Sequence, residues 1–300
     1  MKKDYAATNA ASSGVELERK SLKALCRRSD RPGLLFLVKW AFSLALTGYL
    51  VHLAMGTGWV WPAMFVYGSV IGLPAYAMSH ESAHGTAFRT RWLNELVFWI
   101  TSIIYMEEPL YRRYTHTGHH TYTLYEGKDS QLPTLPMTLG QWLYEVTGLA
   151  ITWLHLQALL RLVTNRYTAT MLEVIPQDEM PRIRRNAWVF VGIYSAIGLA
   201  IALGVDALLW YLVIPVFLGQ TTMVAFGIIQ HVEMAKNVPS IIDSTRSFRT
   251  NPLVSFLYLN MEHHIEHHLY PQVPFYALPQ LNKALSSQLP EPDRLSAHLH

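Results

Sequence analysis

The stretch LLFLVKWAFSLALTGYLVHLAMGTGWVWPAMFVYGSVIGLPAYAMSHESAH (residues 34–84) decides the fold. It contains two apolar segments, Leu34–Met55 and Trp59–Met78, which are joined by only three residues. Each segment has about 20 residues, the length at which an α-helix crosses about 30 Å of hydrocarbon. We therefore expect a membrane-spanning helical hairpin, with two histidines directly after its second helix.

A second hairpin of the same kind is predicted further along the chain. Its apolar segments are Trp188–Leu203 and Leu208–Gln230, and residues 204–207 connect them. Two other apolar stretches, Leu93–Met106 and Trp142–Val163, are short or interrupted by polar residues. We interpret both as interfacial or partly immersed helices.

The composition agrees with a membrane protein. Hydrophobic residues make up 51% of the 300 residues and charged residues only 15%, whereas soluble domains carry about 25% charged residues. The single cysteine, Cys26, excludes a disulfide within one chain and a four-thiolate iron–sulfur cluster. A net charge of +3 gives no reason to expect nucleic-acid binding. The predicted fold class is an all-α integral membrane protein with four spans in two hairpins.

The positions of the basic residues predict the orientation. Of the 24 Lys and Arg residues, all except Lys39 lie before the first span, between the second and third spans or after the fourth. The positive-inside rule then places both termini and the long middle loop in the cytoplasm, with the chain in the cell (inner) membrane. Residues 1–33 are expected to form a cytoplasmic arm, either disordered or a surface helix on anionic lipid, and residues 286–300 a surface tail.

Histidines carry the functional signal, because most of the 14 lie in tight clusters. Within each cluster the spacing is i, i+3 or i+4, which places the side chains on one helix face. All the clusters also fall on the cytoplasmic side of the predicted topology. His231 stands alone, but it directly follows the fourth span on the same side, and with it the set has nine histidines: His80, His84, His116, His119, His120, His231, His264, His267 and His268. His263 is an alternative to His264, because it also pairs with His267 at i, i+4.

Nine imidazoles are too many for one metal ion, since zinc takes four ligands and a catalytic zinc only three from the protein. Nine imidazoles suit two six-coordinate metal ions, each of which keeps one or more coordination positions free of protein ligands. Imidazole is compatible with iron, copper, nickel or zinc, and two irons are the useful choice if the chemistry activates dioxygen. We expect a helical cap on the cytoplasmic side to hold this centre. His52, His155, His298 and His300 have no patterned neighbour and are interpreted as bystanders.

These motifs resemble the membrane fatty acid desaturase and hydroxylase superfamily. The residues that carry the resemblance are HESAHGTAF (80–88), YRRYTHTGHHTYT (111–123), QHVE (230–233) and NMEHHIEHHLYPQVPFYALP (260–279). Together with the four spans, the resemblance covers residues 34–285, which would form one desaturase-like membrane domain.

The resemblance implies a cytoplasm-facing di-iron centre that oxidises an unactivated C–H bond with dioxygen and two electrons. By position, the nine histidines above are its ligands. The default substrate is a lipid or acyl chain and the default reaction is desaturation. A hydroxylase, monooxygenase or ketolase that acts on an alkyl chain, a carotenoid or a small metabolite is the alternative.

The electron donor is expected to be a separate ferredoxin or similar carrier with its reductase, because no His-Pro-Gly-Gly heme motif or Gly-x-Gly-x-x-Gly fingerprint occurs. Metal-bound imidazoles usually donate their second N–H to a carboxylate or carbonyl. Five carboxylates near the histidines are candidates for this role: Glu81, Asp129, Glu233, Glu262 and Glu266. Glu107 and Glu108 are weaker candidates.

Two rival functions belong to other classes. His80-Glu81-x-x-His84 fits the H-E-x-x-H pattern of zinc proteases, with Glu81 as general base, but leaves six histidines unexplained. A metal carrier or transporter would hold its site near the midplane on broken helices, whereas these histidines lie beyond the span ends. The content of metal in the purified protein distinguishes these rivals from a di-iron enzyme.

Overall fold

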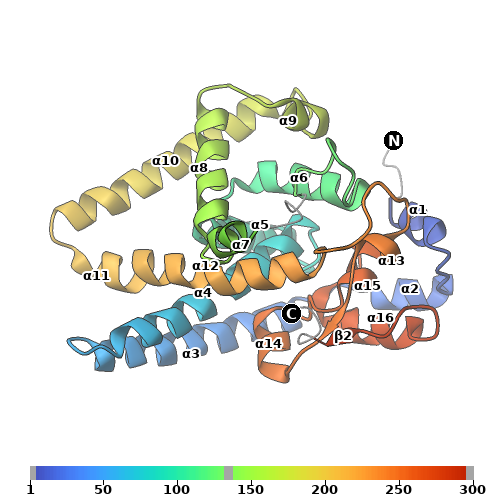
Figure 1. Ribbon diagram of the computed structural model, residues 1–300, viewed down its shortest axis with the longest axis horizontal. Helices are drawn as coiled ribbons and strands as arrows, with labels where there is room; N and C mark the ends of the chain where they lie inside the picture. Colours follow the sequence, from blue (N-terminus) through green and yellow to red (C-terminus); the bar gives the residue numbers. More distant parts are fainter. Residues whose placement is uncertain (1–4, 132–137, 295–300) are drawn as a thin grey trace.

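The computed structural model describes residues 5–131 and 138–294, and the chain in these ranges is mostly helical (Figure 1). The only strands among them, β1 (Phe248–Arg249) and β2 (Asp293–Arg294), form a two-residue parallel pair. The helical fold class predicted from the sequence is therefore confirmed. The helices are α1 (Tyr5–Ser12), α2 (Arg19–Leu25), α3 (Asp30–Ala54), α4 (Val60–Ala83), α5 (Arg91–Tyr105), α6 (Pro109–Thr121), α7 (Leu139–Val146), α8 (Leu149–Val163), α9 (Ala169–Val174), α10 (Met180–Ala202), α11 (Asp206–Leu208), the π-helix η1 (Leu209–Val213), α12 (Ile214–Ile229), α13 (Ile241–Ser244), α14 (Pro252–Leu257), α15 (His264–Leu269), the 3₁₀-helix η2 (Phe275–Ala277) and α16 (Leu278–Leu285).

Four helices of the described residues are long and apolar enough to cross a membrane: α3, α4, α10 and the continuous run Asp206–Ile229. They form the two predicted hairpins, and both hairpin turns lie at the left end of Figure 1. Large apolar side chains remain exposed on the outer helices; Phe42 on α3, for example, is 70% exposed. Such a surface is unfavourable in water and suits contact with lipid.

The helices extend beyond the apolar segments read from the sequence. Helix α10 begins at Met180, eight residues before the predicted span. Its first turns contain Arg182, Arg184 and Arg185, whose long side chains can reach the polar interface while the backbone remains helical. Helix α4 likewise continues through residue 83, so that its last turn already carries a histidine. Apolar patterning locates a span but underestimates the helix that contains it.

The two interfacial predictions correspond to α5 and to the pair α7–α8. Helix α5 packs along α4. Helices α7 and α8 are bent by 65° at Gly148, and as a pair they pass the same length and composition test as the four spans. Gly148 has φ 77°, and a Cβ there would lie 2.6 Å from Cβ of Gln220. Glycine is therefore required at this bend by both backbone conformation and space.

Helices α4 and α12 cross at the centre of the molecule, and their contact is made by glycines. A Cβ on Gly68 would lie 1.8 Å from the carbonyl oxygen of Pro215, and one on Gly219 would lie 2.0 Å from that of Gly68. Small residues permit such close approach between helices in membranes, where packing rather than the hydrophobic effect drives association. This contact fixes the C-terminal ends of α4 and α12. Those ends carry His80, His84 and His231.

The N-terminal arm is helical rather than disordered. Helix α1 packs against α15 and α13, and Asn9, Ala10 and Val15 are buried. In Figure 1, α1, α2, α15 and α16 gather at the right end, opposite the hairpin turns. The arm is thus part of the helical layer that covers the histidines.

Candidate metal centre

Four segments bring the nine histidines together. Helix α4 contributes His80 in its last turn and His84 at its C-cap, and one residue of the set, His231, follows α12. Helix α6 begins at Pro109, where Glu108 caps it by accepting a hydrogen bond from the backbone N–H of Tyr111 at 2.6 Å. The remaining histidines lie on α6 and α15, where their spacing puts them on inward faces.

The histidines form two groups of close, mostly buried side chains. Within each group, one potential ligand atom from every residue lies within 4.8 Å of those from all the others. The first group (group one) consists of His80, His84, His116, His120 and His267. The second group (group two) consists of His119, His231, His264 and His268.

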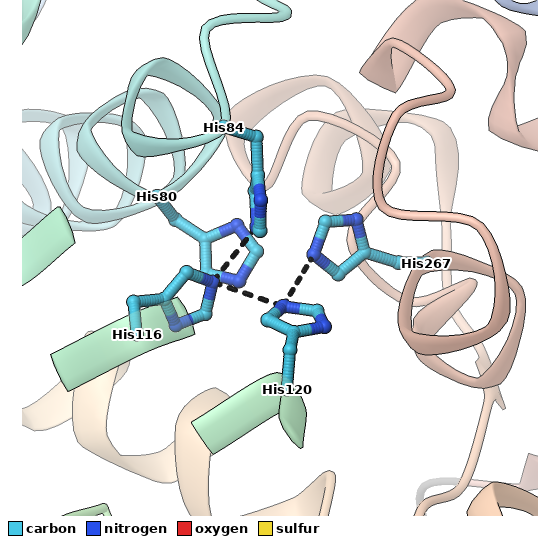
Figure 2. Close-up of side chains that lie close together, drawn as sticks. All are labelled: His80, His84, His116, His120 and His267. Atoms are coloured by element: carbon cyan, nitrogen blue, oxygen red, sulfur yellow. Dashed lines mark hydrogen bonds between the residues drawn. The ribbon is translucent and has the colours of Figure 1, made fainter. Parts of the chain in front are cut away.

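In group one the ring nitrogens converge on a common point (Figure 2). The Nε2 atoms of His84 and His116 are 2.9 Å apart, those of His116 and His120 3.1 Å, and those of His120 and His267 3.2 Å. The ring of His80 lies among them with both nitrogens buried and without a hydrogen-bond partner among the described residues. A proton can bridge only one of these pairs of nitrogens at a time. A cation at the common point can bind all the converging nitrogens together.

Group two repeats this arrangement. The Nε2 atom of His264 lies 3.1 Å from Nε2 of His231 and 3.1 Å from Nε2 of His268. The ring of His119 packs edge-on against His231 and His268, with centroids 4.9 Å apart in both cases. The two groups are adjacent, because the rings of His120 and His268 stack with centroids 4.1 Å apart.

These nitrogen–nitrogen distances fit ligands of a metal ion. Two imidazole nitrogens at right angles, each about 2.1 Å from a metal, are about 3.0 Å apart, whereas tetrahedral angles give about 3.4 Å. The separations of 2.9–3.2 Å match the right-angled, six-coordinate case. The residues present therefore fit a metal pair held by nitrogen ligands.

Burial also keeps the imidazoles in the neutral form that binds metal. It lowers the pKa of His84 and the pKa of His231 to about 3. Burial, reinforced by the neighbouring histidines, also lowers the pKa of five others well below its ordinary value: His116, His120, His264, His267 and His268. A ligand site whose imidazoles need not lose a proton binds metal without competition near neutral pH.

Several outer ring nitrogens are held by other groups. His119 Nδ1 lies 2.9 Å from Asp129 Oδ2, and His231 Nδ1 lies 3.0 Å from the carbonyl oxygen of Ser244. Asp129 also accepts hydrogen bonds from the backbone N–H groups of Leu124 and Gln131. Although burial opposes ionisation, His119 and these two amides together lower the pKa of Asp129. The anion then fixes the tautomer and orientation of the His119 ring.

Of the five carboxylates predicted to support the histidines, only Asp129 bonds one of them in the described structure. The backbone N–H of Phe275 donates to Glu81 at 3.1 Å, and Ser255 donates to Glu262. Glu266 accepts from the Ser247 hydroxyl at 2.6 Å, and Glu233 is exposed. For these four carboxylates the support of a histidine stays a prediction. Three of them, Glu81, Glu262 and Glu266, accept hydrogen bonds from other residues around α15.

The structure distinguishes His264 from the histidines outside the two groups. His264 belongs to group two, whereas His263 precedes α15 and faces a different hollow near Pro290. His52 lies exposed near the hairpin turn of α3 and α4. His155 was predicted to be a bystander, yet it is buried on the wall of the cavity described below. His298 and His300 lie outside the described residues.

One residue of the N-terminal arm reaches two of the histidine helices. The side-chain amide of Asn9 donates to the carbonyl oxygen of His120 at 3.0 Å and to that of His268 at 3.1 Å. Both carbonyls lie in the last turn of their helix, where the backbone provides no partner. Asn9 therefore caps α6 and α15 together, and no local pattern in the sequence reveals this.

A cavity of about 490 Å³ lies against both groups, within the size range of small-molecule sites. His80, His116, His119, His231 and His264 contribute to its wall. The rest comes from α4–α9, from α12 and its C-cap, and from the segments that connect α5 to α6 and that follow α6 and α8. A substrate in this cavity would touch both groups of histidines.

The comparisons with known proteins agree with this geometry. The profile described as fatty acid desaturase matches residues 56–298. The chain belongs to this family. It is 26% identical over 279 residues to the sphingolipid delta(4)-desaturase/C4-monooxygenase DES2 of Homo sapiens, covering 88% of this chain and 76% of the relative. It is also 26% identical over 263 residues to the sphingolipid delta(4)-desaturase DES1 of Drosophila melanogaster, covering 82% of this chain and 73% of the relative.

Membership of the fatty acid desaturase family makes the chain a membrane oxidoreductase, as the sequence predicted. Desaturation and hydroxylation both fit, since the human relative is named for both activities. The zinc protease and the metal carrier are set aside. The histidine clusters are consistent with the metal site expected of such an enzyme.

Proposed function

We propose that this protein is a di-iron, dioxygen-dependent desaturase of a lipid or acyl-chain-like substrate, in which all nine clustered histidines are iron ligands. Group one would hold one iron and group two the other. The observation that carries the proposal is the convergence of buried, neutral imidazole nitrogens at right-angle spacing in two adjacent groups. Six-coordinate ions with five and four protein ligands would keep positions open for chemistry.

The overall reaction would remove two hydrogens from adjacent carbons. A –CH₂–CH₂– unit, one O₂, two electrons and two protons give –CH=CH– and two waters. The iron pair supplies the oxidising power for the C–H bond when bound. The protein's own part is to fix the nine rings, to keep Asp129 ionised against His119 and to hold the chain beside His80 and His264.

Hydroxylation is the second candidate, favoured by the monooxygenase activity in the name of the human relative. It consumes the same O₂, electrons and protons, but yields an alcohol and one water. Both reactions begin from a C–H bond at the same site, and a ketolase would repeat the hydroxylation. The sphingolipid substrates named for the relatives support a long-chain substrate here.

For the membrane orientation, we propose that the end carrying the histidines is cytoplasmic in the cell (inner) membrane. The hairpin turns would lie on the far side, which agrees with the absence of Lys and Arg from residues 55–59 and 203–206. The two electrons would come from a separate ferredoxin-like carrier and its reductase. Such a carrier would approach the cytoplasmic end, where the basic residues also favour an acidic partner.

The test is analysis of the lipids of cells that express the protein, with His267→Ala and His52→Ala as paired variants. We expect a new double bond or hydroxyl group with the wild type and with the exposed control His52→Ala, and none with His267→Ala. A product that persists in His267→Ala would contradict the ligand role of group one. A product that carries only a hydroxyl group would favour the second candidate.

A further inference from the structure

One wall of the cavity carries a buried ion pair that the iron ligand set does not use. Arg112 Nη1 donates to Glu107 Oε2 at 2.7 Å, and the two side chains are 2% and 10% exposed. A buried pair of this kind contributes little net stability, because desolvation offsets the attraction between the charges. Its location in the cavity therefore needs another explanation.

Aromatic rings complete this wall. The guanidinium carbon of Arg112 lies 4.5 Å from the centroid of the Tyr105 ring and 5.3 Å from that of Tyr76. The ring of His155 meets Tyr105 edge-on with centroids 4.7 Å apart. Two atoms of the wall, Arg112 Nε and His155 Nδ1, are buried without a hydrogen-bond partner among the residues the structure describes. We call Tyr76, Tyr105, Glu107, Arg112 and His155 the polar wall.

The polar wall lies one helical turn from group one. Arg112 precedes His116 by four residues on α6, and Tyr76 precedes His80 by four residues on α4. Side chains at this spacing are about 5–6 Å apart. A substrate group on the polar wall would thus lie a few bonds from a carbon that touches group one.

Apolar side chains also line the cavity. They include Ile151, Leu154 and Ala158 on α8, together with Met223, Val224 and Ile228 on α12. A hydrocarbon chain can lie along these side chains. A pure hydrocarbon, however, would shield Glu107 and its polar neighbours from water without replacing the hydrogen bonds that water makes to them. This loss costs binding free energy.

The charges on the polar wall restrict the class of ligand. Glu107 and Arg112 neutralise each other, so a carboxylate would be repelled by Glu107 and would find Arg112 already paired. A cation would be repelled by Arg112 and would find Glu107 already paired. A neutral O–H or N–H group can donate to the carboxylate, and a neutral oxygen can accept from the guanidinium, without an unpaired charge.

We propose that the polar wall is the specificity site for an amphiphilic substrate, and that it binds a neutral hydroxyl or amide group a few bonds from the carbon that is oxidised. This inference rests on the proposed function for the nature of the reaction. A measurement of ligand binding, which needs no turnover, tests the polar wall itself. Glu107, Arg112 and His155 are assigned here to substrate selection, and not to holding the metal.

The test compares a long-chain N-acyl amino alcohol with its O- and N-methylated analogue, which keeps the shape but lacks the O–H and N–H donors. Equilibrium binding to the purified wild-type protein should favour the parent compound by at least about tenfold. The double variant Glu107→Leu/Arg112→Met removes both charges together, a change that buried ion pairs often tolerate. It should bind both compounds with similar affinity while keeping the metal content of the wild type.

His155→Leu provides a second variant that leaves the ion pair intact, in case the double variant does not fold. It should reduce the preference several-fold. Equal binding of the two compounds by the wild type would overturn the proposal, and so would an unchanged preference in a folded variant. If the preference behaves as predicted but no oxidation product forms, the polar wall stands and the proposed function fails.

Discussion

Asn9→Ala should destabilise the protein strongly, although Asn9 lies more than 70 residues from the nearest clustered histidine in the sequence. The change deletes two buried hydrogen bonds of 3.0 and 3.1 Å and leaves the last-turn carbonyls of His120 and His268 without partners. Each hydrogen bond contributes about 1 kcal/mol, and each buried acceptor left unpaired costs about 1 kcal/mol or more. The expected loss of unfolding free energy is therefore about 2–4 kcal/mol.

Thermal unfolding of the purified protein in detergent measures this loss. For a chain of this size the Tm should fall by roughly 3–6 °C. Asn9→Asp should be less stable than Asn9→Ala at neutral pH, because a carboxylate oxygen would face the same two carbonyl oxygens. Lys20→Ala, an exposed change in the neighbouring helix α2, serves as the matched control and should leave the Tm unchanged. If Asn9→Ala melts within about 2 °C of the wild type, the reasoning that α1 caps both helices is wrong.

Three further predictions concern the site and its surroundings. His264→Ala should lose bound iron and turnover, whereas His263→Ala should keep both; metal analysis and product assays measure this, and the reverse result would move the ligand to His263. Asp129→Asn should weaken metal affinity by about 10–100-fold, as measured by chelator competition, because His119 loses its anionic partner; unchanged affinity would remove that role. Burial raises the pKa of Glu108 to about 7, so the folded state binds the proton more tightly than the unfolded state does, and the unfolding free energy should fall as the pH rises from about 4.5 to 7. Glu108→Gln should lack this part of the pH dependence in denaturant titrations, and an equal dependence in both proteins would contradict it.

The spans and the histidine set could be predicted from the sequence because both depend on local periodicity. A run of about 20 apolar residues specifies a crossing helix wherever it occurs. Spacings of three and four residues place histidines on one helix face regardless of the rest of the chain. His264, His267 and His268 repeat the H-x-x-H-H pattern of His116, His119 and His120, which favoured His264 over His263, and the structure brings His264 into group two.

The division of the histidines between the two groups could not be predicted. On α6, His116 and His120 belong to group one, whereas His119 belongs to group two. Residues separated by three and by four positions point to slightly different sides of a helix axis. Which side meets which neighbour depends on how α4, α12 and α15 pack around α6.

Long-range polar contacts could not be predicted from the sequence either, because they also depend on how the helices pack. Asn9 bonds carbonyls 111 and 259 residues away. The carboxylates next to the histidine motifs were expected to support the rings, but Glu81 accepts from the backbone N–H of Phe275 and Glu266 from the Ser247 hydroxyl. His155 has no patterned neighbour in the chain, yet it lies on the cavity wall, where its ring meets Tyr105 of α5. Only tertiary structure determines such contacts.

The most direct test of the account is the iron content of freshly purified, active protein, measured together with that of one variant from each group. The wild type should hold two irons per chain, because the nine imidazoles form two separate ligand groups. His267→Ala should reduce iron in group one, and His231→Ala should reduce iron in group two. An active wild type that holds one stoichiometric zinc, or variants that both retain two irons, would contradict the di-iron centre.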